Sequence, residues 1–210
     1  MNGRRMKVVR LPGIHHDGNA VLVSGSLGHL LINAGTSWYQ SLQVERIMGQ
    51  LEGERLDRIL LTSRRFPVSG GAAHVAEGFG GIPVHIHPDG QAALETGDFF
   101  TTWANRYDSD MPRTATEGLS EEDVFPMGGG EVIPLHLPGH ASEGMGFHIP
   151  HLSTLVVGAL LPRADRPTRW DLPGGSLIDI IASMKRIKRL NLSSIVPLQG
   201  PATRGKEHVQ

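Results

Sequence analysis

Residues 58–71 read RILLTSRRFPVSGG, and this stretch decides how the rest of the chain is interpreted. The apolar run from Arg58 to Thr62 predicts a buried strand. Apolar residues then recur at helical spacing from Ala72 to Phe79, and another strand is expected from Val84 to His87. A strand, a helix and a strand in succession predict parallel strands joined by a crossover helix.

Apolar runs on both sides of this unit predict further strands. They are Lys7–Leu11, Ala20–Val23, Leu30–Asn33, Glu131–Leu137, Gly146–Ile149, Thr154–Leu160 and Ser194–Leu198. Two amphipathic helices are expected, one from Tyr39 to Leu51 and one from Ser176 to Leu190. Their apolar faces are predicted to contain Val44, Ile47, Met48 and Leu51 in the first helix, and Leu177, Ile180, Ile181, Met184 and Ile187 in the second. The less periodic stretch from Pro88 to Asp123 predicts helix and exposed loop.

Length and composition favour one large domain, 1–210, because single hydrophobic cores keep growing to about 250 residues. The net charge of −1 gives no overall attraction to nucleic acid or to a membrane surface. Cysteine is absent, which excludes disulfides, thiolate zinc sites and a cysteine nucleophile. No apolar run has the length of a signal peptide core or a membrane span, so we expect a cytoplasmic protein.

Four short motifs carry a family resemblance. They are Thr62-Ser63-Arg64-Arg65-Phe66-Pro67-Val68-Ser69-Gly70-Gly71, Leu137-Pro138-Gly139-His140-Ala141, Val157-Gly158-Ala159 and Pro197-Leu198-Gln199-Gly200-Pro201. With the order of elements around them, they resemble the metallo-β-lactamase superfamily, especially its small glyoxalase-II-like hydrolases. The resemblance covers nearly the whole chain. It implies an α/β (α+β) fold, the four-layered αβ/βα sandwich of the metallo-β-lactamase fold.

The same resemblance identifies the positions at which this family holds two metal ions. The family motifs Thr-His-x-His-x-Asp-His, Pro-Gly-His-Thr, Gly-Asp and Gly-His-Gly-Pro place the ligands on Ser63, Arg65, Pro67, Val68, His140, Ala159 and Gln199. Of these seven positions, only His140 keeps a metal-binding side chain. A further family aspartate, in Leu-Ile-Asp-x-Gly, falls on Asn33.

These replacements argue against a metal centre. Catalytic zinc needs about three protein ligands, and one imidazole cannot hold it. Arg65 places a permanent cation where the ion would lie and repels it. We therefore predict no metal and no other cofactor. Gly70-Gly71, Pro138-Gly139 and Gly200-Pro201 remain, because the turns of the fold need their backbone conformations.

Several side chains are candidates for a role in the altered site. The catalytic candidates are His140, Arg65 and Gln199, and the candidate ligand-binding residues are Arg64, Arg65, His16, His87 and His140. Arg64 and Arg65 either bind an anion bidentately or, in the case of Arg65, pair with an internal acid. The two histidines His85 and His87 either form one polar edge of a strand or contribute to a relocated metal site with His136 or His140.

Function stays open between two classes. The leading interpretation is a catalytically degenerate protein that acts in binding, regulation or assembly through its remodelled cleft, with a small anionic ligand or a protein as partner. A homodimer, or a hetero-oligomer with a metal-bearing paralogue, fits this interpretation. The alternative is a divergent hydrolase of a thioester or small ester with a mononuclear or metal-free site. Nucleic-acid binding is the least favoured interpretation, and it would use the basic residues Arg163, Arg166, Arg169, Lys185, Arg186, Lys188 and Arg189.

The centre left by the ligands should be refilled, because a polar cavity would leave buried donors and acceptors unpaired at about 1–3 kcal/mol each. Phe66 and Val68 supply apolar volume. Arg65 is expected to reach a carboxylate, a backbone carbonyl or an anion, with His140 and Gln199 facing the same small space.

Overall fold

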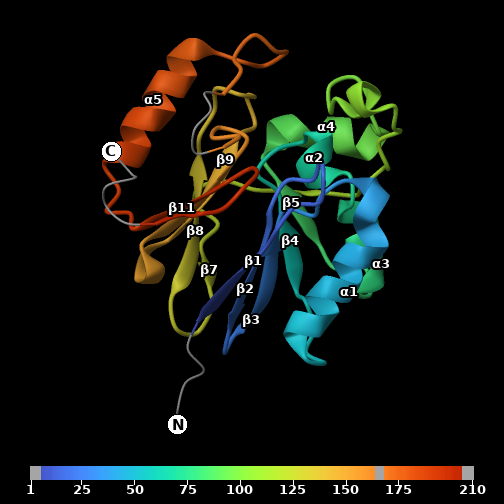
Figure 1. Cartoon of the computed structure of the whole chain (residues 1–210), viewed down its shortest axis with the longest axis vertical. Helices are drawn as coiled ribbons and strands as arrows, with labels where there is room; N and C mark the ends of the chain where they lie inside the picture. Colours follow the sequence, from blue (N-terminus) through green and yellow to red (C-terminus); the bar gives the residue numbers. More distant parts are fainter. Residues whose placement is uncertain (1–5, 164–167, 205–210) are drawn as a thin grey trace.

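Two six-stranded sheets lie between helices in the computed structural model, which describes residues 6–163 and 168–204 (Figure 1). The first sheet has the strand order β1 (Lys7–Leu11), β2 (Ala20–Gly25), β3 (Gly28–Ile32), β4 (Arg58–Leu60), β5 (Val84–Ile86) and β6 (Glu117–Gly118). The second has the order β12 (Thr203–Arg204), β11 (Ser194–Pro197), β10 (Thr154–Gly158), β9 (Met145–Ile149), β8 (Glu131–His136) and β7 (Phe125–Pro126).

The strands from β3 to β6 are parallel, which confirms the pairing predicted from the strand–helix–strand succession. β10 and β11 are also parallel, and the remaining pairs are antiparallel. The short strands β6, β7 and β12 were not expected, since two residues are too few for a period-2 pattern to be visible in the sequence.

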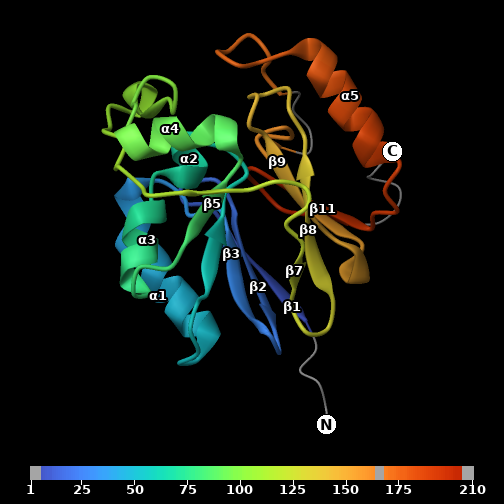
Figure 2. The ribbon, with the colours of Figure 1, turned by 180° about the vertical axis from the view of Figure 1, so that it is seen from behind.

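Helices cover the outer face of each sheet. The helical elements are η1 (Ser37–Tyr39), α1 (Gln40–Leu51), α2 (Phe66–Ser69), α3 (Ala72–Gly78), α4 (Pro88–Thr96), η2 (Ala104–Tyr107), η3 (Pro150–Leu152) and α5 (Leu177–Lys188). Seen from behind in Figure 2, α1 and α3 lie against the first sheet, and α5 lies on the far side of the second. This is the four-layered sandwich that the resemblance implies.

The core is divided by the two sheets into three layers. Ile32 of β3 and Phe147 of β9 meet between the sheets. Ile59 of β4 packs with Ile47 of α1 on one outer side, and Ile187 of α5 belongs to the cluster on the other. Because successive strand residues point to opposite faces, each sheet contributes to two layers.

The predicted helix faces need correction. Met48 of α1 and Leu177 and Ile181 of α5 are 47%, 49% and 48% exposed, although all three were expected on the apolar faces of these helices. In α5 the buried residues are Ser183 and Ile187, and Ile180 and Met184 pack partly buried against the same cluster, while Leu177, Ile178 and Ile181 are exposed. Among the described residues, no helix combines the length and the apolar character that a membrane span requires.

Candidate functional site

The segment after β4 carries the first group of candidate residues and leads into the single turn of α2. Arg65 is the extended residue before α2, and Pro67 lies in its first turn, where a missing N–H costs no intrahelical bond. Ser63, Arg64, Arg65, Pro67 and Val68 are all buried. Their polar groups therefore need partners inside the protein.

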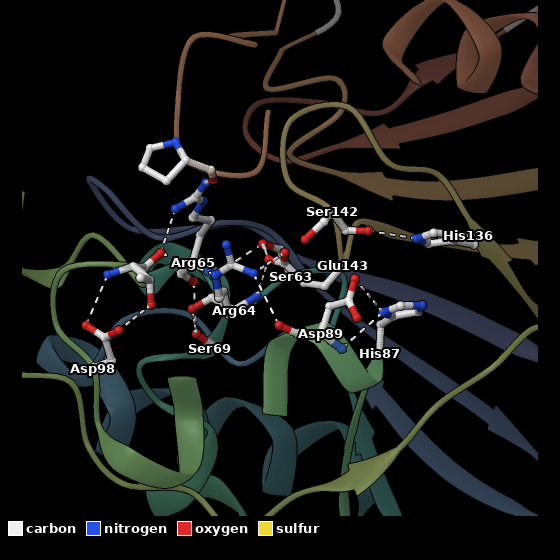
Figure 3. A network of polar contacts seen from close by, with 12 residues as sticks. Ser63, Arg64, Arg65, Ser69, His87, Asp89, Asp98, His136, Ser142 and Glu143 are labelled. Carbon is white, nitrogen blue, oxygen red and sulfur yellow. Dashed lines mark hydrogen bonds and ion pairs between the residues drawn. The ribbon is translucent and has the colours of Figure 1, made fainter. Parts of the chain in front are cut away.

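A carboxylate that the sequence did not single out binds two of them. Glu143, in the loop between β8 and β9, is fully buried. Its Oε1 accepts hydrogen bonds from Ser63 Oγ at 2.9 Å and from the Arg64 backbone N–H at 3.2 Å, and its Oε2 lies 2.5 Å from Arg64 Nη1 (Figure 3). Arg64 also donates to the carbonyls of Asp89 and Thr101. Its charge is thus neutralised internally by an acid from a distant loop.

Arg65 takes a different direction from its neighbour. Its Nη1 donates to the carbonyl of Thr101 at 2.6 Å and its Nη2 to that of Pro173 at 3.1 Å. The guanidinium lies over the Trp103 ring, 4.7 Å from its centroid. Burial lowers the pKa of Arg65 to about 10, so the side chain stays charged at neutral pH. The predicted contact with backbone carbonyls is confirmed, whereas the acid expected to pair with Arg65 binds Arg64 instead.

The Arg65 Nε atom is buried and has no hydrogen-bond partner in the part of the chain that the structure describes. Only 3% of Arg65 as a whole residue is exposed. An unpaired buried donor costs about 1–3 kcal/mol. One buried donor at the position of the former metal centre is therefore left without a described acceptor.

His140 and Ala159 are brought together through Thr168. Thr168 Oγ1 donates to the Ala159 carbonyl at 2.9 Å and lies 3.2 Å from His140 Nδ1. His140 Nδ1 also lies 3.1 Å from the Arg169 carbonyl, which can only accept, so we assign the imidazole proton to Nδ1. Burial, with a contribution from the nearby Arg65 cation, lowers the pKa of His140 to about 4. The imidazole is neutral at physiological pH.

Gln199 binds a segment near the start of the chain. Its amide Nε2 donates to the carbonyls of His16 and Asp17 at 3.3 and 3.4 Å, and no described hydrogen bond joins it to Arg65 or His140. These contacts give no support to the expectation that the three side chains face one another, which stays a prediction. The segment 16–19 connects α2 with the residues after β11. Gly18 N donates to the Pro67 carbonyl at 2.7 Å, and Asn19 N donates to the Leu198 carbonyl at 2.6 Å.

Asn33, which stands where the family has an aspartate, serves the backbone. Its Oδ1 accepts from Thr62 N at 3.0 Å and Thr62 Oγ1 at 2.9 Å, and its Nδ2 donates to the Asn19 carbonyl at 3.4 Å. An aspartate could not make the last of these contacts, because an ionised carboxylate has no donor. Asn33 therefore ties the neighbouring strand end in place.

The other candidate histidines lie apart from His140. His85 is buried, contacts the Phe125 ring and lies 3.6 Å from Glu117. His87 accepts from Asp89 N at the start of α4 and stacks on His136, with 4.4 Å between ring centroids. The strand β5 ends at Ile86, so His85 lies within it and His87 directly follows it. Burial is the main reason that the pKa values of His85 and His87 are lowered.

His16 is exposed and belongs to an aromatic group beside α2. Its ring lies 6.1 Å from that of Trp38 and 5.5 Å from that of Tyr107, and both of these rings contact buried Phe66. Phe66 thus supplies the apolar volume that was expected of it. The contacts of His16 are those of a surface aromatic cluster.

An open groove of about 530 Å³ lies next to the buried ion pair. It is lined by Arg64, Asp89, Ala92, Ala93, Thr96, Asp98, Thr101 and Ser142. The lining carries two carboxylates, and its only cation among the described residues is Arg64, already paired with Glu143. The groove floor is therefore a poor anion site, contrary to the role expected of Arg64.

Comparisons with known proteins were made at the level of sequence and structure. A scan against protein-family models finds no match. A protein of Aquifex aeolicus (strain VF5), described as uncharacterized, is 38% identical over 69 residues, which are 33% of this chain and 32% of that protein. The sequence match thus spans about a third of each protein.

Solved structures cover far more of the chain. BLEG-1, a B3 metallo-β-lactamase, is 22% identical with a TM-score of 0.80, over 94% of each chain. TTHA1623 in a di-iron-bound form is 29% identical with a TM-score of 0.76, over 93% of this chain and 94% of that one. The chain has the metallo-β-lactamase fold. A metallo-β-lactamase of Cronobacter sakazakii described by a HARLDQ motif is 18% identical, with a TM-score of 0.70 over 94% of this chain and 79% of that one.

In this metallo-β-lactamase fold, the residues at the family's ligand positions do not fit a dinuclear metal centre. Ser63 donates to Glu143, Arg65 holds a buried cation there, and the Ala159 side chain offers no donor atom. Across residues 6–163 and 168–204, no group of three His, Cys, Asp or Glu side chains is arranged to hold a metal ion. This includes His85, His87, His136 and His140, the members of the suggested relocated site.

The basic residues of the last third are partly neutralised. Arg186 pairs with Glu121, and Arg169 forms a bidentate pair with Asp171 through contacts of 3.0 and 2.6 Å. Arg166 lies outside the described residues. Lys185, Lys188 and Arg189 are exposed on α5 or at its end, as on an ordinary solvated helix face, and Arg163 is exposed in the segment after β10.

Sequence reasoning missed Glu143, Thr101 and Trp103. One signal for Glu143 was available: two adjacent arginines after a buried strand require an internal acceptor, and buried arginine is usually paired. Thr101 contributes a backbone carbonyl, which no residue type reveals. Trp103 has a left-handed backbone with φ of 68°, which is rare for a bulky residue and has no sequence pattern.

Proposed function

We propose that this chain is a metal-independent protein of the metallo-β-lactamase fold that acts by binding rather than by metal-assisted hydrolysis. The observation that carries the proposal is the buried contact of Glu143 with Ser63 and Arg64, at 0% exposure of the carboxylate. A guanidinium and a carboxylate hold together, by direct contact, loops that a shared metal ion would otherwise join. The fold can thus keep the shape of the site without an ion.

The comparisons give two reference points for this proposal. TTHA1623, 29% identical, is described in a di-iron-bound form, so a similar chain can carry metal when its residues allow it. The motif His-Ala-Arg-Leu-Asp-Gln of the Cronobacter protein has an arginine in its third place, as does the segment 63–68 of this chain. Here the change extends further, because Pro67 and Val68 also lack ligand atoms.

Metal content is the direct test. We expect the purified protein, dialysed against a weak chelator, to contain well under one equivalent of zinc, iron or manganese per chain by elemental analysis. TTHA1623, prepared in the same way, is the positive control. About two retained ions per chain would refute the proposal.

Thermal unfolding with and without EDTA gives an independent readout. Because folding free energy here does not include metal binding, the midpoint should be unchanged by the chelator. The control protein should lose stability under the same conditions. A large drop in the midpoint of this chain would reveal a metal site.

The second candidate function is a metal-free hydrolase of a thioester or small ester, and it depends on the neutral His140 beside Arg65. His140 Nε2 would then act as the base. A panel of thioesters and small esters, assayed with the native chain and with His140→Gln, separates the two candidates. Turnover that His140→Gln abolishes would favour the hydrolase, and none is expected. A cytoplasmic location and a homodimer or hetero-oligomer remain predictions.

A further inference from the structure

Three arginine side chains surround one tryptophan at the rim of the site. The Cζ atoms of Arg65, Arg106 and Arg169 lie 4.7, 5.2 and 5.9 Å from the ring centroid of Trp103. Arg65 is buried beneath this group, whereas Arg106 and Arg169 are exposed. Three permanent cations thus meet within a few ångströms of one ring.

Among the described residues, the charge of this group is not balanced. Asp171 is the carboxylate bound to Arg169, and Arg106 has no ion pair or side-chain hydrogen bond with any described residue. His140, next to Trp103, is neutral at physiological pH. The group therefore carries a net charge of about +2, and a multivalent anion would relieve its self-repulsion.

The position of Trp103 is fixed before any ligand arrives. Asp98 accepts hydrogen bonds from the backbone N–H groups of Phe100 and Thr101 at 2.9 and 3.2 Å, and Trp103 N donates to the Phe100 carbonyl at 3.1 Å. The Arg65 bond to the Thr101 carbonyl holds the same loop from below. These contacts hold Trp103 in its left-handed backbone conformation. Its ring is therefore already in position for the two exposed arginines to pack against it.

The bidentate pair of Arg169 with Asp171 shows how an oxyanion can bind here. The carboxylate occupies Nε and Nη2 of Arg169, which is the geometry a phosphate also uses. Both side chains are about half exposed, and exposed pairs contribute only about 0–1 kcal/mol, so an incoming anion can displace Asp171. The buried Nε of Arg65, which has no partner among the described residues, adds a donor to the same cationic group.

We propose that Arg106 and Arg169, presented by Trp103 above Arg65, bind the dianionic phosphate group of a small ligand. Asp171 occupies the site when the ligand is absent and competes with it. This inference rests on the proposed binding function and names the class of ligand. Its chemistry fits inorganic phosphate and a phosphate monoester alike.

The test is a calorimetric titration at about pH 8, where phosphate is mainly dianionic, with inorganic phosphate in one arm and phenyl phosphate in the other. Chloride at equal ionic strength is the reference. We expect saturable binding of at least one phosphate probe. Arg106→Gln and Arg169→Gln should weaken it about tenfold, and the exposed, distant Arg55→Gln should leave it unchanged.

The direction of the affinity change in Asp171→Asn tests the proposal most directly. Removing the competing carboxylate should tighten phosphate binding by about threefold or more. A merely ionic effect would give the same response with chloride and the same loss in Arg55→Gln. Either of these results, or weaker binding in Asp171→Asn, overturns the phosphate site. Failure here with a metal-free protein leaves the proposed function standing, whereas two bound metal ions would refute that function whatever the titration shows.

Discussion

The base and the rim of the site use the same residue type in opposite ways. At the base, Arg64 and Arg65 are almost completely buried and donate hydrogen bonds to Glu143 and to backbone carbonyls. At the rim, Arg106 and Arg169 are exposed, and Arg106 contacts the Trp103 ring but has no ion pair or side-chain hydrogen bond with a described residue. Buried arginines with internal acceptors maintain the shape of a site, while exposed ones without acceptors are available to a ligand.

The largest effect is expected at the base, from Glu143→Gln. This change leaves the Arg64 guanidinium buried without its counter-charge, and breaking one side of a buried pair costs about 3–5 kcal/mol. Urea unfolding of the variant and of the exposed control Glu122→Gln measures it. Equal stability of the two variants would show that the base is not held by this pair.

A double variant sharpens this result. Arg64→Met with Glu143→Leu removes both charges together and leaves neither buried alone. Apolar replacement of a whole buried pair is often neutral, so the double variant should be more stable than Glu143→Gln. If it is less stable, the hydrogen bonds of Arg64 to the Asp89 and Thr101 carbonyls outweigh the ion pair.

The next largest effect is expected from Arg65→Ala. It strands the carbonyls of Thr101 and Pro173 and should destabilise the fold by about 2–4 kcal/mol, measured by the same unfolding. Arg65→Lys, which keeps the charge and can reach one carbonyl, should lose less. A stability change within error for Arg65→Ala would move this residue from the structural base to the ligand-binding rim.

His140 gives a smaller effect that depends on pH. Its folded pKa of about 4 lies below the ordinary value of 6.5, so protons bind the unfolded chain more strongly. The stability it contributes is complete above about pH 6.5 and is lost as the pH falls toward 4. As the pH falls from about 6.5 to 4, the free energy of unfolding of His140→Gln should decrease by roughly 2 kcal/mol less than that of the native chain. Parallel pH curves for the two proteins would contradict this assignment.

The smallest effect is expected at the rim itself. Arg106→Gln should change the free energy of unfolding by no more than about 0.5 kcal/mol, because Arg106 is exposed and has no ion pair or side-chain hydrogen bond with a described residue. The same urea experiment measures it. A loss above about 1 kcal/mol would mean that the two regions do not differ in the way described above.

Much of the fold could be predicted because its turns leave local marks. Gly139 has φ of 135°, and a Cβ there would lie 2.6 Å from Ile180 N, so this glycine is needed where α5 meets the second sheet. Gly70 and Gly71 are kept for another reason than the expected one. Their φ values of −59° and −88° are ordinary, but a Cβ would meet the Phe66 ring or the Ala34 carbonyl at 2.7 Å.

The site was less predictable because its contacts join distant segments. Adjacent Arg64 and Arg65 point to different partners, a choice that depends on the backbone between β4 and α2. Glu143 lies 79 residues from Arg64, and no periodicity links them. Gln199 was expected near His140 because the motifs of the family converge there, but in this chain it binds backbone carbonyls of the segment beside α2.

The two carbonyls bound by Arg65 also bear on the order of folding. Thr101 lies 36 residues from Arg65 and Pro173 lies 108 residues away, in the other half of the chain. Closing a loop of this length has a larger entropic cost than forming a local contact. We therefore expect the Pro173 contact to form after both sheets have docked. Arg65→Ala should therefore accelerate unfolding and leave the refolding rate nearly unchanged, with a φ-value near zero. Arg65, which occupies the position of a metal ligand, would then slow unfolding. It would affect how long the native state persists rather than how quickly it is reached.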